Sequence, residues 1–177
     1  MDIVIILQII TMGISLFTLI FNAVITINEN RKKNYLDLTT AYRIQVLTKT
    51  RELMSNIVTL ANPMVCRNAV GNKEYIKEIV KVKADLDIIL KDTNEEELEL
   101  KNLVGDIVRD VYIFFNDPNL EKEEMINCKL RRLLYLYSIY DSADWKFIKM
   151  QSTGKIFNNK EWLEFYEHYK NKFPNMD

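Results

Sequence analysis

The chain has 177 residues, of which 24 are basic and 25 acidic, so its formal net charge is -1. A nearly neutral chain gains little attraction to a nucleic-acid backbone, and we expect no direct nucleic-acid binding. Two cysteines and one histidine are too few for a structural zinc site or a disulfide framework. We therefore predict neither a metal nor another cofactor.

A long uncharged segment opens the chain. Residues 3–27 carry no charged side chain, and as a helix they span roughly 37 Å, more than the hydrocarbon core of a bilayer. A secretory signal peptide would begin with basic residues and end in a small-residue cleavage site, whereas only Asp2 precedes this segment. We therefore expect residues 1–28 to remain attached as a single transmembrane helix.

Basic residues follow the apolar segment directly, at Arg31, Lys32 and Lys33. The positive-inside rule then predicts an external N-terminus and a cytoplasmic remainder, in which both cysteines stay reduced. Residues 28–51 carry six basic side chains against two acidic ones, a balance that suits anionic lipid headgroups. We divide the chain into a transmembrane helix (1–28), a juxtamembrane basic helix (29–62) and a cytoplasmic helical domain (63–177).

The cytoplasmic part is predicted to be helical, because four glycines and three prolines leave long segments with helical apolar spacing. A helix over 33–61 ends at Asn62-Pro63 and can continue the membrane helix; another is predicted over 73–91. The first has its predicted core positions at Leu38, Tyr42, Val46, Leu53, Ile57 and Leu60. The second has its stripe at Ile76, Ile79, Val80, Lys83, Leu86 and Leu90.

Three further helices are predicted. One begins at Thr93 as N-cap, with Glu96 closing a capping box, and ends at 116–118. Its inner face consists of Leu100, Leu103, Val104, Ile107, Val111 and Phe114. The next runs over 119–140, residues 141–157 are expected to be broken by SADW and STGK, and Asn159 caps a last helix that ends at Phe173. The predicted fold class is all-α: a transmembrane helix followed by a four- or five-helix bundle.

Polar side chains recur every three or four positions within the apolar segment. On a helical wheel at 100° per residue all six fall within an arc of about 80°. They are Gln8, Thr11, Ser15, Thr18, Asn22 and Thr26. Lipid offers such side chains no hydrogen-bond partner, so we expect the stripe to face other protein chains or a water-filled lumen.

Three assemblies explain this polar stripe. In a small homo-oligomer, Ser and Thr allow close approach while Gln8 and Asn22 hydrogen-bond between helices. In a ring of about five or more chains, the stripe lines a pore with little ion selectivity. Packing on a different membrane protein is the third.

No catalytic arrangement stands out. His168 is the only histidine and lacks a convincing partner, so we expect a solvated or helix-packing role. The acidic group at 95–99 suits the positive end of a helix dipole, and Arg131 and Arg132 suit a solvated helix edge. The aromatic residues of the last helix are expected in the core or at a subunit interface. These are Trp162, Phe165, Tyr166, Tyr169 and Phe173.

The segment NENRKKNYLDLTTAYRIQVLTKTRELMSNIV, residues 28–58, resembles a juxtamembrane pattern that follows the single N-terminal span of many small bacterial proteins linked to phage defence or mobile elements. With its length, its span and its helical remainder, the chain looks most like the small membrane accessory proteins of type VI-B CRISPR systems. That resemblance implies a HEPN-like cytoplasmic domain and a ring-shaped homo-oligomeric pore in the bacterial inner membrane. It also implies that the pore enhances antiviral defence, with an RNA-guided CRISPR effector acting upstream.

The chain departs from the HEPN ribonuclease pattern of an Arg, often followed by Asn, with a His four to six residues further on. Arg67 and Asn68 begin such a motif in CRNAVGN, but Asn72 stands where the histidine would be, and no Arg precedes His168 at the required spacing. Asn cannot act as a general base at neutral pH. We therefore expect no enzymatic activity. The alternatives are a membrane-tethered ribonuclease or toxin, and a passive phage-exclusion or immunity protein.

Overall fold

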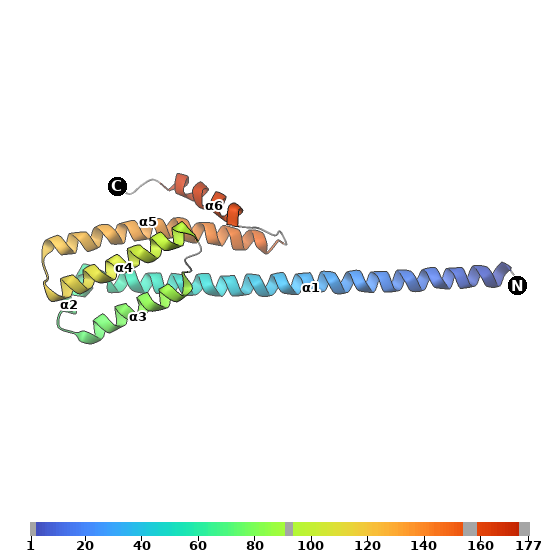
Figure 1. Cartoon of the computed structure of the whole chain (residues 1–177), viewed down its shortest axis with the longest axis horizontal. Coiled ribbons are helices and arrows are strands. Elements are labelled where there is room, and N and C mark those ends of the chain that lie inside the picture. The colour runs from blue at the N-terminus through green and yellow to red at the C-terminus, as the bar shows by residue number, and fades with distance from the viewer. Residues whose placement is uncertain (1–2, 91–93, 154–158, 174–177) are drawn as a thin grey trace. The chain divides into compact units, whose positions relative to one another are not determined.

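The computed structural model describes residues 3–90, 94–153 and 159–173, with side chains for residues 11–90, 94–153 and 160–173 (Figure 1). Six helices and no strand lie in these ranges, so the all-α prediction is confirmed. The helices are α1 (Ile3–Leu60), α2 (Pro63–Asn68), α3 (Lys73–Ile89), α4 (Glu95–Asn116), α5 (Leu120–Gln151) and α6 (Asn159–Lys172). Residues Met1–Ala41 and Tyr42–Asp177 are separate compact units, here called the first unit and the helical unit.

In the first unit the described residues form helix only. Every described side chain from Thr11 to Tyr35 is exposed, including many large apolar ones. Among the described residues, α1 is the one helix long and apolar enough to cross a membrane. Exposed apolar surface of this extent is typical of helices that contact lipid or another protein.

In the helical unit, asparagine side chains begin four successive helices. Asn62, Asn72, Asn94 and Asn119 each accept a hydrogen bond from a backbone N–H in the first turn of α2, α3, α4 or α5, at 2.7–3.1 Å. Each bond satisfies a donor that the helix itself cannot pair. The cap of α4 is therefore Asn94; the predicted cap, Thr93, lies outside the described residues.

The short helix α2 was not predicted. Asn62 caps it, and Pro63 occupies its first turn, where a missing N–H costs no helical hydrogen bond. The Asn62-Pro63 pair that ends α1 thus also begins the next helix. After α2, Gly71 has a φ of +88°, a conformation that glycine adopts without strain, and Asn72 then caps α3.

The core of the helical unit matches the predicted face of α4, because all six predicted residues are buried. The predicted stripe of α3 is partly wrong: Val80 is 48% exposed, whereas Tyr75 and Val82 are buried. The Tyr75 hydroxyl donates to the Leu60 carbonyl oxygen and lies 3.0 Å from the Cys66 Sγ. These two contacts turn the side of α3 that carries Tyr75 toward the core.

At the other end of the core, two predicted α1 positions are also wrong. Leu38 and Tyr42 are exposed, while Leu53 and Ile57 are buried. Contact between α1 and α5 is seen at Arg43, whose guanidinium lies 4.9 Å from the ring centroid of Phe147. The apolar spacing of α1 therefore includes residues that lie outside the core.

Helix α5 is longer than predicted, because it continues through the SADW segment to Gln151. Figure 1 shows it beside α4, with α6 along its C-terminal half, and α5 packs against both helices. Ala143 and Phe147 extend its buried face beyond Tyr140. The break expected within 141–157 is therefore wrong as far as Gln151, and Asp141 and Asp144 find partners on other helices. Residues 154–158 lie outside the described part of the chain.

Replacing Phe114 with alanine tests this core. Phe114 is fully buried in α4, so Phe114→Ala should lower the free energy of unfolding by about 4 kcal/mol. Tyr112, in the same helix, is 56% exposed, and Tyr112→Ala should cost less than about 1 kcal/mol. Denaturant titration followed by circular dichroism measures both, and equal losses would contradict the assigned face of α4.

Candidate functional site

The polar stripe lies on an exposed part of α1. The side chains of Thr11, Ser15, Thr18, Asn22 and Thr26 are all exposed, and that of Gln8 lies outside the described residues. Ser15 Oγ donates to the Thr11 carbonyl oxygen at 2.9 Å, and Thr18 Oγ1 donates to the Ile14 carbonyl oxygen at 2.8 Å. These two hydroxyl donors are satisfied within their own helix, so they tolerate hydrocarbon without a partner chain.

Asn22 differs from these hydroxyl residues. Among the described residues its side chain makes no hydrogen bond, although it carries two N–H donors and an acceptor oxygen. Within hydrocarbon such a group needs water or another chain, because an unsatisfied polar group there costs several kcal/mol. Asn22 is therefore the described stripe residue whose chemistry most requires a partner.

The other side of the same helix carries stacked aromatic rings. Phe17 and Phe21 lie with ring centroids 6.3 Å apart and planes 12° from parallel. At 100° per residue both lie outside the arc of the polar stripe. The first unit therefore presents one polar face and a broader apolar surface suited to lipid.

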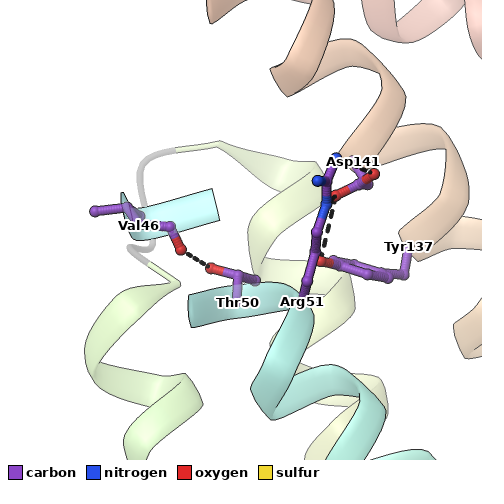
Figure 2. Close-up of polar contacts among 5 residues, drawn as sticks. All are labelled: Val46, Thr50, Arg51, Tyr137 and Asp141. Atoms are coloured by element: carbon purple, nitrogen blue, oxygen red, sulfur yellow. Dashed lines mark hydrogen bonds and ion pairs between the residues drawn. The ribbon is translucent and has the colours of Figure 1, made fainter. Parts of the chain in front are cut away.

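In the helical unit, a charged seam joins α1 to α5 (Figure 2). Arg51 donates two hydrogen bonds to Asp141, from Nε to Oδ1 at 2.6 Å and from Nη2 to Oδ2 at 2.9 Å. The hydrogen-bonded Asp141 carboxylate raises the pKa of Arg51 further, and Tyr137 donates a long 3.5 Å bond to the same carboxylate. Arg51 also lies 5.8 Å from the ring centroid of Trp145.

The seam changes the interpretation of the basic segment 28–51. Arg43 lies over Phe147, Arg51 binds Asp141, and Lys49 pairs with Glu52 at 3.0 Å. Arg31, Lys32 and Lys33 are exposed. The sequence predicted that the basic side chains of this segment meet lipid headgroups. Arg43 and Arg51 instead contact α5 within the helical unit.

A second polar group, here called the Asp144 cluster, joins α4, α5 and α6. Its members are Glu97, Tyr140, Asp141, Asp144 and Trp162. Tyr140 donates to Glu97 Oε1 at 2.8 Å, and the Trp162 indole N–H donates to Asp144 Oδ1 at 2.7 Å. Burial raises the pKa of Asp144 to about 6, against the opposing effect of the Trp162 hydrogen bond. Sequence reasoning missed this cluster, since it interpreted SADW as a helix break.

The predicted HEPN residues are not brought together. Arg67 pairs with Glu123 at the start of α5, and Asn72 accepts the backbone N–H of Glu74 as the cap of α3. Asn68, the last residue of α2, is exposed. His168 is exposed on α6, which lies along the C-terminal half of α5, and its ring meets the edge of Tyr169 at 5.3 Å (Figure 1).

The aromatic residues of α6 belong to the core, as one of the two interpretations predicted. Trp162 and Tyr166 are buried, while Phe165, Tyr169 and Phe173 pack at the edge of the same cluster. Among the acidic residues of α4, Glu97 accepts from Tyr140, and Glu99 pairs with Arg132 at 2.7 Å. No group of three or more metal-ligating side chains gathers among the residues that the structure describes.

These features define an all-helical protein with one N-terminal helix able to span a membrane. Comparisons of the chain with protein-family models, with curated proteins and with solved structures found no match.

The bidentate geometry of the seam predicts a measurable coupling. In a double-mutant cycle, Arg51→Ala and Asp141→Ala should show an interaction of about 1 kcal/mol in the free energy of unfolding, since both groups are partly exposed. The more exposed pair Lys49 and Glu52, on the same helix, is the matched control and should couple by about 0.3 kcal/mol or less. Equal coupling in the two cycles would contradict a specific role for the seam.

Proposed function

We propose that this chain is a single-span membrane protein that assembles with copies of itself and makes the membrane permeable. The observation that carries the proposal is the Asn22 carboxamide, which lies in an apolar helix and has no hydrogen bond among the described residues. Another copy of α1 supplies the same group at the same depth. Two amides that face each other can each donate and accept, so self-association satisfies both.

The rest of the polar stripe favours a ring over a pair of helices. Thr11, Ser15, Thr18 and Thr26 extend the polar face along the helix, whereas a pair needs only one or two polar contacts. Back-bonded hydroxyls keep acceptor lone pairs, and these can bind water in a lumen. Because no stripe residue is charged, the lumen discriminates little between ions.

The apolar side of α1 completes the arrangement. Phe17 and Phe21 lie outside the polar arc, where a ring of helices contacts lipid. The exposed Arg31, Lys32 and Lys33 follow the apolar segment and would meet the headgroups of the inner leaflet. This direction of insertion would put the N-terminus in the periplasm and the helical unit in the cytoplasm.

The biological setting rests on the resemblance described above. From that resemblance we propose that the protein acts in the bacterial inner membrane and that its permeability is a step in antiviral defence that follows an RNA-guided effector. A helical unit on the cytoplasmic side would be the part of the chain that receives such a signal. A passive exclusion or immunity protein would instead protect cells without any leakage.

Asn22→Leu tests the proposal directly. Loss of one interhelical hydrogen bond of about 1 kcal/mol per chain, repeated around a ring, should lower assembly by more than about tenfold. Leakage of an entrapped dye from proteoliposomes should fall accordingly, at equal amounts of inserted protein.

The matched control moves the amide instead of deleting it. Ile20→Asn combined with Asn22→Leu keeps one carboxamide in the helix but places it on the opposite face. It should leak as little as Asn22→Leu alone. Leakage at the level of the unmodified chain in either variant would contradict assembly through this face.

A further inference from the structure

Charged side chains follow the polar stripe where the apolar segment ends. Glu29 is the first charged residue after the uncharged segment 3–27, and three basic residues come directly behind it, Arg31, Lys32 and Lys33. All four side chains are exposed, and α1 continues through them without a break (Figure 1). The charge at the end of a lumen is therefore set by which of them share the face of the stripe.

The helical wheel separates Glu29 from two of the basic residues. With Gln8 at zero and 100° per residue, the stripe covers about 280–360°, and Glu29 lies within it at about 300°. Arg31 and Lys32 lie at about 140° and about 240°, on the side that faces lipid in a ring of helices. Each chain of such a ring would therefore place one Glu29 carboxylate at one mouth of the lumen.

Lys33 is the opposing charge on this face, at about 340°. Along the helix axis it lies about 9 Å beyond Ile27, whereas Glu29 lies about 3 Å beyond it. Glu29 is therefore nearer the low-dielectric hydrocarbon, where a fixed charge acts more strongly on a passing ion. The long stem of Lys33 also carries its ammonium group toward water or headgroups.

The Glu29 carboxylate is not neutralised by its own helix. Glu29 and Lys33 stand four residues apart, a spacing that allows an ion pair on a helix. In the part of the chain that the structure describes, neither side chain makes one. A ring of chains would therefore present several unpaired carboxylates at the same depth.

We propose that Glu29 makes the lumen prefer cations to anions. This inference rests on the proposed function, because it needs a ring of chains around the polar stripe. Carboxylates repeated around a mouth repel anions and raise the local concentration of cations such as K⁺ and Na⁺. The uncharged stripe itself discriminates little, so the preference comes from the Glu29 ring at its end. Monovalent cations are then the ions that pass, and their flow discharges the membrane potential.

The ratio of K⁺ to Cl⁻ permeability measures this preference. The full chain is reconstituted in planar bilayers of phosphatidylcholine, which has no net charge and adds no surface potential of its own. From the reversal potential in a KCl gradient, the ratio should be about threefold or more in favour of K⁺. Because this ratio does not depend on the number of pores, a variant that assembles less well still reports it.

Glu29→Gln removes the carboxylate and should bring the ratio to about one or below. The matched control exchanges two neighbours: Asn28→Glu combined with Glu29→Asn keeps composition and net charge but moves the carboxylate to about 200°, outside the stripe. It should lose the preference as Glu29→Gln does. Lys33→Gln removes the opposing charge and should raise the ratio.

The outcomes separate this inference from the proposed function. No current from the unmodified chain would contradict the pore, and the role of Glu29 with it. A current that K⁺ and Cl⁻ carry equally would overturn the role of Glu29 while the pore stands. A K⁺ preference that survives Glu29→Gln, or the exchange of Asn28 and Glu29, would overturn it in the same way.

Discussion

A bilayer core contains almost no water, so each polar group placed there must find its hydrogen bonds within protein or in a lumen that the protein builds. The backbone of α1 meets this requirement as a helix, and Ser15 and Thr18 meet it through carbonyl oxygens of their own helix. Asn22 does not meet it among the described residues. A hydroxyl can donate its one hydrogen bond to a carbonyl oxygen of its own helix, whereas a carboxamide has two N–H donors that need acceptors. The proposed assembly follows from this difference.

The helical unit is organised around the C-terminal half of α5. Asp141 binds Arg51 of α1, Asp144 accepts from Trp162 of α6, and Tyr140 donates to Glu97 of α4. These three residues lie within two turns of one helix, so polar contacts to three other helices converge there. Tyr140 and Trp162 are themselves buried, so the carboxylates that accept their hydrogen bonds satisfy polar groups which would be costly to leave unpaired.

Much of this fold was predictable from the sequence because helical apolar spacing is strong in it. Six of the eight buried residues of α4 were predicted, and the exceptions are Val108 and Asp110. The predicted C-terminal end of α6 agrees to within one residue. The prediction was wrong where tertiary contacts decide the outcome. Val80 has the spacing of a core residue, but the hydroxyl bond of Tyr75 to Leu60 sets which edge of α3 faces inward.

The SADW segment shows the same limit. It was expected to break the helix, yet Asp144 within it accepts a hydrogen bond from Trp162, and Asp141 just before it binds Arg51. Both partners lie more than fifteen residues away in sequence. Spacing within one segment carries no information about such pairs, and the Asp144 cluster could not be inferred from it. The polar stripe of α1 could be recognised because its residues are local to one helix. The partner that we propose for it cannot be identified from that spacing.

The mass of the detergent-solubilised full chain, measured by light scattering with the detergent contribution subtracted, tests the central claim most directly. Assembly through the Asn22 face predicts a discrete protein mass of about five or more chains, which Asn22→Leu reduces. A monomer or dimer for the unmodified chain, or a mass that Asn22→Leu leaves unchanged, would contradict it.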